Sequence, residues 1–128
     1  MSDSGPRKDY HTVTPYLVVP EVARLIEFLT RAFGAVERMR LPRGDGSVMH
    51  AEVMIGDSVV MMGEPMPGMS AMPGAIFLRV ADADAAYRAA LAAGATSVSE
   101  PVDQPHAGER YGGVTDPCGN MWWPAARL

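Results

Sequence analysis

The sequence predicts an α+β fold made of two βαβββ repeats, whose strands form curved mixed sheets around a concave pocket. Three observations carry this prediction. An apolar strand pattern, then a helix pattern and a glycine, occur in the first half and return about 60 residues later. Each copy continues with three more short strand patterns. The matching segments are 13–19 and 76–80 for the strands, and 21–33 and 82–93 for the helices, closed by Gly34 and Gly94.

The first repeat contains an amphipathic helix pattern followed by a hairpin. Pro20 stands at the helix entry, where proline is tolerated, and Gly34 is a stop signal. The sequence Arg43-Gly44-Asp45-Gly46 predicts a hairpin turn between strands at 36–41 and 48–55. A second turn at 55–58 leads into a strand at 59–62. The apolar helix stripe consists of Val22, Leu25, Ile26, Leu29 and Phe33.

The second repeat has an alanine-rich helix, for which Asp82 or Asp84 is the expected N-cap. Strand patterns at 96–102 and 110–115 flank a loop at 104–109, and a strand at 121–125 closes the sheet. The small side chains let this helix pack close to the sheet. Its inward face is expected to consist of Ala83, Ala86, Tyr87, Ala90 and Leu91.

One domain is expected over residues 11–128, after a flexible segment at 1–10. Repeat one spans 11–63 and repeat two spans 74–128, with a linker at 64–73 that is rich in Pro, Gly and Met. Six of the ten methionines lie between residues 54 and 72. They either fill gaps in the core or adapt a surface to varied apolar ligands.

Bulk properties exclude several classes of partner. A formal net charge of -4 argues against nucleic-acid binding, and no apolar run is long enough to span a membrane. The single Cys118 excludes an internal disulfide framework and fits a reducing cytoplasm. We therefore expect a cytoplasmic protein whose partner is a small molecule.

His50 and Glu52 are the candidate catalytic residues. Residues i and i+2 of a strand share a face, so both point toward the concave side or solvent. Histidine suits a general base near neutral pH, and Glu52 orients His50 only if the two side chains meet. An ion pair without chemistry and a partial metal site are the alternatives, since catalytic zinc normally takes three protein ligands. The opposite, apolar face is expected to hold Met49, Ala51, Val53 and Ile55.

Three groups of segments carry a family resemblance. They are 13–17 leading to Phe28 and 32–34, then 48–52 with 55–58, and finally 110–113 with Asp116-Pro117, Gly119-Asn120 and Trp122-Trp123. The chain resembles the glyoxalase/bleomycin-resistance family of the vicinal oxygen chelate superfamily, and within it the PhnB-like subgroup. This resemblance implies a homodimer, because single-module members often complete their concave sites across a two-fold axis.

The resemblance also implies a divalent metal held by four His, Gln or Glu side chains. The matching positions fall on Thr14, Met61, Ala75 and Trp123, none of which suits a hard or borderline cation. A shift of one residue in either direction brings in no ligand. We therefore expect no metal and no cofactor.

Aromatic residues point instead to an apolar ligand site. Of the adjacent Trp122 and Trp123, one faces the helix and the other, Trp123, the pocket. By the same alternation Tyr16, Met61 and Phe77 share that face. Such a pocket suits stacking on a planar or apolar molecule, or else the rings fill a vestigial cavity.

Arg110 completes the candidate binding residues. It lies beside Tyr111, where it either clamps an anion or forms a structural salt bridge with Glu109 or Asp116. Cys118 sits in a tight turn without an apparent base and is expected to be inert.

Three functions follow from these residues. The leading prediction is metal-free binding of a small aromatic or apolar molecule, as in antibiotic sequestration, by Tyr16, Met61, Phe77, Arg110 and Trp123. The alternative is an enzyme of the same fold, of lyase, isomerase or dioxygenase type, that uses His50 and Glu52 as an acid–base pair or partial metal site. A structural or partner-binding module would need a large exposed apolar patch, for which the Met-rich linker is the candidate.

Overall fold

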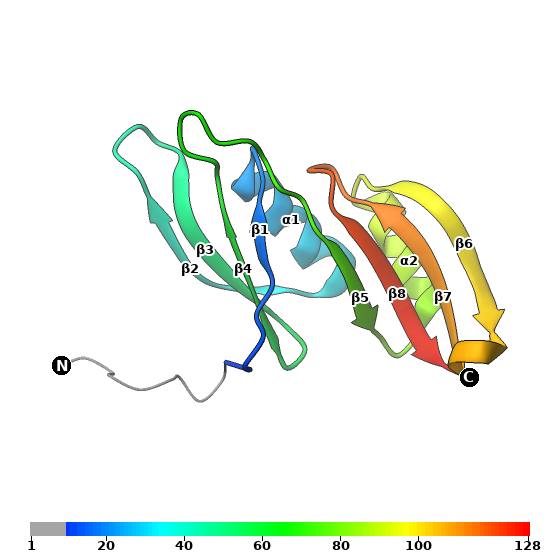
Figure 1. The fold of residues 1–128 in the computed structure, drawn as a ribbon. Helices are drawn as coiled ribbons and strands as arrows, with labels where there is room; N and C mark the ends of the chain where they lie inside the picture. The colour runs from blue at the N-terminus through cyan, green and yellow to red at the C-terminus, as the bar shows by residue number, and fades with distance from the viewer. Residues whose placement is uncertain (1–9) are drawn as a thin grey trace.

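The computed structural model describes residues 10–128, which form two four-stranded mixed sheets and two α-helices (Figure 1). Sheet A has the strand order β1-β4-β3-β2 and sheet B the order β5-β8-β7-β6. In each sheet the first strand pairs in parallel with the last, and the other pairs are antiparallel. The two sheets thus have the same topology, which confirms the predicted α+β fold of two βαβββ repeats.

The element bounds lie close to the predicted ranges. In the first repeat they are β1 (Tyr16–Val18), α1 (Val22–Phe33), β2 (Val36–Pro42), β3 (Val48–Ile55) and β4 (Ser58–Gly63). In the second repeat they are β5 (Ala75–Arg79), α2 (Ala83–Ala92), β6 (Thr96–Gln104), the 3-10 turn η1 (Pro105–Ala107), β7 (Glu109–Thr115) and β8 (Met121–Arg127).

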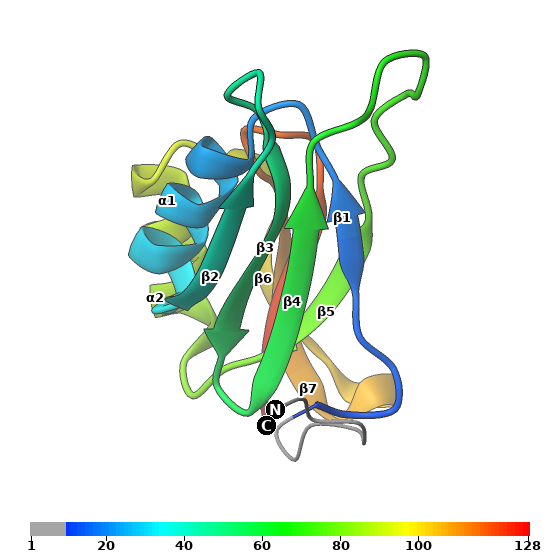
Figure 2. The same ribbon diagram turned by 90° about the vertical axis from the view of Figure 1, so that its left-hand side faces the viewer.

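Both helices lie on one side of the two sheets (Figures 1 and 2) and contact each other. Helix α1 buries the predicted stripe except Phe33, which is half-buried, and Gly34 ends the helix in the left-handed conformation at φ 70°. The N-cap residue Glu21 makes no side-chain cap, and Glu64, the residue after β4, instead accepts a 3.0 Å hydrogen bond from the backbone N–H of Val22. Neither helix of the described residues is long and apolar enough to cross a membrane.

Helix α2 begins as predicted, because Asp82 Oδ1 accepts a 3.0 Å hydrogen bond from the backbone N–H of Ala85. Its buried residues are Ala83, Tyr87 and Ala90. The expected inward orientation of Leu91 was wrong, since 36% of this residue is exposed. The buried positions follow the spacing i, i+4 and i+7, and the next residue points about 100° away around the helix.

Strand β3 corrects one further expectation. Ala51, Val53 and Ile55 face the helix and are buried, but Met49 is 47% exposed and Val48 is buried in its place. The pairing of β2 with β3 shifts between Leu41 and Pro42. Proline has no N–H for a regular ladder, so the alternation breaks at the start of β3.

Strand β1 is shorter than its predicted range of 13–19. Val13 is 83% exposed and lies before the strand, and Pro15 has no N–H to donate. The predicted linker at 64–73 lies between β4 and β5, and its Met72 forms a bridge with Val18. Residues 1–9 of the segment expected to be flexible lie outside the described residues.

Candidate functional site

The face of each sheet turned away from the helices, which we call the helix-distal face, carries most of the candidate residues. In sheet A a row of side chains crosses all four strands, because Tyr16 pairs with Met61, Met61 with Glu52, and Glu52 with Met39. Leu17 and Met62, the following residues on β1 and β4, point to the helices and are buried. Tyr16, Met61 and Glu52 therefore lie side by side on one face of the sheet, as the alternation of side chains along each strand predicts.

His50 and Glu52 meet in the structure. His50 Nε2 lies 2.8 Å from Glu52 Oε2, and His50 Nδ1 lies 3.3 Å from the hydroxyl of Tyr16. Glu52 is only 4% exposed, and its Oε1 accepts a hydrogen bond from the hydroxyl of Tyr10. The guanidinium of Arg38 lies over the Tyr10 ring, 5.8 Å from the centroid. The condition for Glu52 to orient His50 is therefore met.

Sheet B carries an aromatic cluster on its helix-distal face. Phe77 pairs in register with Trp123, and its ring meets that of Tyr111 edge-on at a centroid distance of 5.5 Å. Phe77 is 47% exposed, whereas Trp123 is half-buried. A Cβ at Gly113 would lie 3.2 Å from Trp123 Nε1, so the absence of a side chain there leaves room for the indole. The guanidinium of Arg79 lies 5.9 Å from the centroid of the Phe77 ring.

The orientation of Trp123 depends on its neighbour Trp122. Trp122 is fully buried on the helix side, where its ring lies 5.5 Å from that of Phe33. Its indole N–H donates a 2.8 Å hydrogen bond to Asp116 Oδ2. Because neighbouring residues of a strand point to opposite faces, this anchor turns Trp123 to the helix-distal face.

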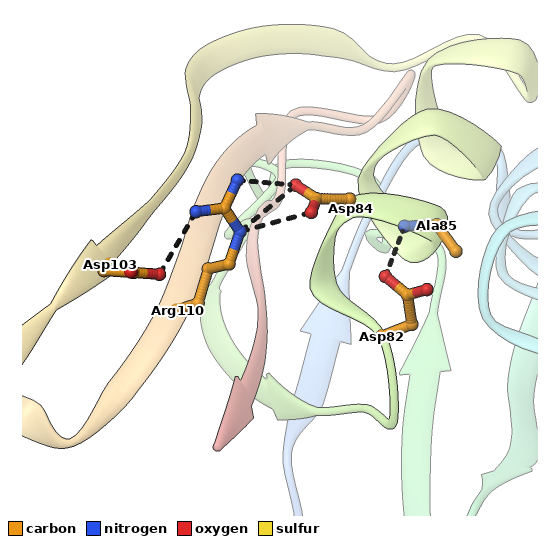
Figure 3. Close-up of polar contacts among 5 residues, drawn as sticks. All are labelled: Asp82, Asp84, Ala85, Asp103 and Arg110. Carbon is orange, nitrogen blue, oxygen red and sulfur yellow. Dashed lines mark hydrogen bonds and ion pairs between the residues drawn. The ribbon is translucent and has the colours of Figure 1, made fainter. Parts of the chain in front are cut away.

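The side chain of Arg110 points from β7 toward Asp84 of helix α2 (Figure 3). Its guanidinium binds Asp84 at 3.1 Å and Asp103 at 3.1 Å, and not Glu109 or Asp116. The hydrogen bonds that Arg110 donates to Asp84 and then to Asp103 raise the pKa of Arg110 further above its ordinary value, so it stays charged. Its two carboxylate partners give it a structural role between β6, β7 and α2.

A cavity of about 620 Å³ lies between the two sheets. Its walls come from β5 and the loop after it, the β3–β4 turn, the segment before β1, and the rings of Phe33 and Trp122. Of the residues predicted to bind a ligand, Phe77 lines this cavity, while Tyr16, Met61, Arg110 and Trp123 do not. His50 and Glu52 are also outside it. The candidate residues thus lie on two helix-distal surfaces, and Phe77 joins one of them to the cavity.

The four positions at which the fold family implies a metal do not form a metal site. Thr14 precedes β1 and donates to the backbone of His11, and Ala75 pairs with Met121. In the structure, the residues that pair with Met61 and Trp123 are Tyr16 and Phe77, and not Thr14 and Ala75. Even if these two residues are counted in place of Thr14 and Ala75, they supply only one further oxygen, the phenol of Tyr16. Across residues 10–128, no three His, Cys, Asp or Glu side chains are grouped to hold a metal ion. This donor set does not fit the implied metal.

Cys118 is a poor candidate nucleophile. Burial, followed by the nearby carboxylate of Asp116, raises the pKa of its thiol to about 11. Its Sγ lies 3.5 Å from the backbone oxygen of Glu21. The thiol therefore stays protonated at neutral pH.

Three residues of the two surfaces were not predicted from the sequence. Tyr10 lies 42 residues from Glu52 in the chain, and no local pattern indicates that contact. Gly63 lies under the hydroxyl of Tyr16, and a Cβ there would be 2.8 Å from that oxygen. Tyr111 lies on the same face as Phe77. The alternation of side chains along β7 indicates this only when the register of the strand is known.

The sequence matches a known family over most of its length. Residues 10–123 match the model of the Glyoxalase/Bleomycin resistance protein/Dioxygenase superfamily. Uncharacterized proteins of Mycobacterium bovis and Mycobacterium tuberculosis are 40% identical over 121 residues, which cover 86% of this chain and 79% and 71% of theirs.

Solved structures share the same fold. TioX from Micromonospora sp. ML1 is 26% identical with a TM-score of 0.76, covering 92% of this chain and 99% of that one. A gene product from Arabidopsis thaliana is 28% identical with a TM-score of 0.72, covering 91% and 98%. A glyoxalase-related enzyme from Fulvimarina pelagi, at 18% identity and a TM-score of 0.73 over 91% and 88%, shares the fold alone. The chain belongs to the Glyoxalase/Bleomycin resistance protein/Dioxygenase superfamily.

Proposed function

We propose that this chain is a PhnB-like member of the superfamily that binds a small planar or apolar molecule at Phe77, without a metal. One observation carries the proposal. Phe77 is 47% exposed although it lies between an aromatic cluster and a cavity of about 620 Å³. An exposed ring in this position offers an unfilled stacking surface to a ligand.

The surroundings of Phe77 support an apolar ligand. The cavity volume lies within the range of about 300–1,000 Å³ typical of small-molecule sites. Ile76, Leu78 and Trp122 contribute apolar wall, and Tyr111 and Trp123 extend the aromatic surface on the other side of Phe77. Aromatic contacts contribute about 0.5–1.5 kcal/mol each beyond the burial of area.

The proposed binding mode is independent of metal because of the donor set. The four positions at which metal ligands are expected carry a hydroxyl, a thioether, a methyl group and an indole, from Thr14, Met61, Ala75 and Trp123. Divalent cations of the hard or borderline type take carboxylate, imidazole or several oxygen ligands. Stacking and apolar burial replace that chemistry here.

Binding of N-phenyl-1-naphthylamine, an uncharged planar fluorophore, tests the proposal. We expect Phe77→Ala to weaken binding about tenfold or more, corresponding to at least about 1.4 kcal/mol. Trp123→Ala should also weaken binding and reduce the quenching of tryptophan fluorescence. Leu91→Ala is the matched control, because Leu91 is an exposed apolar residue on α2. Equal affinities of the wild type and Phe77→Ala would contradict the proposal.

A second candidate is an enzyme of lyase, isomerase or dioxygenase type that uses His50 and Glu52. The 2.8 Å contact between His50 Nε2 and the nearly buried carboxylate of Glu52 favours it, because catalytic histidines are commonly oriented in this way. In a turnover assay, His50→Ala would lower kcat by about 10²–10⁴ while ligand affinity survives. Unchanged turnover in that variant would exclude this role.

A homodimer in a reducing, cytoplasmic compartment completes the proposal. Apolar side chains of both sheets, among them Leu41 and Val102, are exposed at 41% and 51% and offer surface for a second copy. The free thiol of Cys118 fits a reducing compartment. Light scattering of the purified protein measures the oligomeric state, and a monomer at all concentrations would refute the dimer.

A further inference from the structure

Four side chains on the helix-distal face of sheet A form a continuous hydrogen-bonded chain. The hydroxyl of Tyr10 donates to Glu52, Glu52 lies 2.8 Å from His50 Nε2, and His50 Nδ1 lies 3.3 Å from the hydroxyl of Tyr16. From Glu52 to Tyr16 the exposure rises: the side chain of Glu52 is 5% exposed, that of His50 is 22% exposed, and Tyr16 is 46% exposed. At the other end Tyr10 is only partly exposed, so Tyr16 is the end that is more open to a ligand.

The carboxylate of Glu52 fixes the direction of the hydrogen bonds. A carboxylate only accepts, so Nε2 of His50 carries the proton that points to Glu52. Nδ1 of the neutral imidazole is then an acceptor, and the hydroxyl of Tyr16 donates to it. The phenolic oxygen of Tyr16 keeps its lone pairs free to accept one further hydrogen bond from outside.

Gly63 makes this arrangement possible. A Cβ at this position would lie 2.6 Å from the backbone oxygen of Met49 and 2.8 Å from the hydroxyl oxygen of Tyr16. Such distances are shorter than real side chains tolerate. With glycine there, the phenol of Tyr16 lies across β4 and reaches His50 on β3.

We infer that Tyr16, backed by His50 and Glu52, is a binding site for a planar molecule with an acidic hydroxyl group, that is, a phenol or an enol. The ligand hydroxyl donates to the phenolic oxygen of Tyr16. Leu41, which pairs with His50 and is 41% exposed, and Met61, which lies between Tyr16 and Glu52, provide apolar surface for the ligand ring. This site is separate from the one proposed at Phe77.

The same chain also accepts the ligand proton. As the O–H bond of the ligand breaks, Tyr16 takes that proton and passes its own to His50 Nδ1, where an N–H bond forms. The products are a ligand oxyanion, a neutral Tyr16 and an imidazolium that the Glu52 carboxylate stabilises. Among the described residues, the titratable or charged groups that contact one another here include Glu52, Tyr10 and Tyr16, and the guanidinium of Arg38 lies above the Tyr10 ring. The transfer needs no oxidant or reductant.

Two probes test the inference, 4-nitrophenol and 4-nitroanisole, which differ in that the second has no hydroxyl hydrogen. Equilibrium dialysis measures their affinities at a pH at which half of the free nitrophenol is ionised. We expect the wild type to bind 4-nitrophenol about tenfold or more tightly than 4-nitroanisole, as for a charge-assisted hydrogen bond. The absorbance of the nitrophenolate should show a larger ionised fraction for the bound than for the free probe.

Variants locate the effect. Tyr16→Phe removes one oxygen and keeps the ring, so it should abolish the preference for 4-nitrophenol and the extra ionisation. Glu52→Gln should keep part of the preference but lose the ionisation, because the imidazolium loses its counter-ion. Phe77→Ala should leave both effects intact while it weakens N-phenyl-1-naphthylamine.

Each other outcome overturns the inference. Equal binding of the two probes, no binding of 4-nitrophenol, or a preference retained in Tyr16→Phe would remove Tyr16 as the site. A preference lost in Phe77→Ala alone would place the phenol at Phe77, which would support the proposed function and contradict this inference.

Discussion

Asp116 provides the sharpest test of how the second repeat is held together. It is 4% exposed, and its carboxylate accepts four hydrogen bonds. The donors are the backbone N–H groups of Cys118 and Asn120, the side-chain amide of Asn120, and the indole N–H of Trp122, at 2.7, 3.0, 2.9 and 2.8 Å. This one side chain therefore fixes both the β7–β8 turn and the inward orientation of Trp122.

The structure sets the size of the effect of Asp116→Ala. Asn120 and Trp122 are fully buried, so their two side-chain donors would have no acceptor. Each buried donor left unpaired costs about 1–3 kcal/mol, which gives a loss of about 2–6 kcal/mol in the free energy of unfolding. Asp116→Asn keeps one acceptor oxygen and should lose about half as much.

Urea unfolding, monitored by tryptophan fluorescence, measures this loss. The midpoint urea concentrations of the variants can be compared directly if the dependence of the unfolding free energy on urea concentration is unchanged. Asp57→Asn is the control, because Asp57 is exposed in the β3–β4 turn and bonds only its neighbour Ser58 among the hydrogen bonds of the described residues. That control should change stability by no more than about 0.5 kcal/mol. A loss below about 1 kcal/mol in Asp116→Ala would refute the role of the carboxylate.

Three further predictions concern packing and reactivity. Gly63→Ala should destabilise the protein by about 1–3 kcal/mol in the same urea assay, because its Cβ meets a backbone oxygen at 2.6 Å, whereas Gly44→Ala has free space and should be nearly neutral. Leu29→Ala should cost about 2–5 kcal/mol, since Leu29 is fully buried, while Leu91→Ala, 36% exposed, should cost less than about 1 kcal/mol. The pKa of Cys118 is raised from 9.0 to about 11, so its thiol should react with iodoacetamide at pH 8 about 100-fold more slowly than an ordinary thiol. The reaction rate should rise as the pH approaches 11. A rate that levels off near pH 9 would contradict the raised pKa.

The fold was predictable because its local patterns agree with its topology. The stripe of α1 recurs at helical spacing, and all of it except the half-buried Phe33 is buried. Gly34 has the positive φ that a helix stop requires, and Asp82 caps α2. The expectations that failed, at Met49 and Leu91, depend on a strand irregularity beside Pro42 and on which side of α2 meets the sheet. Neither follows from periodicity.

The sequence was enough to predict on which face of a strand each candidate side chain lies, but not which other side chains it contacts. Alternation along β3 places His50 and Glu52 on one face, but the approach of Tyr16 and Tyr10 depends on the order of strands in sheet A. Arg110 illustrates the same limit, because its partners Asp84 and Asp103 lie on α2 and β6 rather than beside it in the sequence. Long-range partners of charged groups require the topology, which single-sequence patterns do not give.

The two repeats share their backbone frame but differ in chemistry at matching positions. Tyr16 pairs with Met61 on the first and last strands of repeat one, as Phe77 pairs with Trp123 in repeat two. The strand beside Met61 carries Glu52, whereas the indole of Trp123 lies against Gly113 on the strand beside it. The hydroxyl that distinguishes Tyr16 from Phe77 is useful because β3 places His50 next to it. In repeat two, β7 instead places the ring of Tyr111 beside Phe77. The same topology thus presents a hydrogen-bonding surface on one sheet and a stacking surface on the other, which is why we assign different ligand chemistry to each.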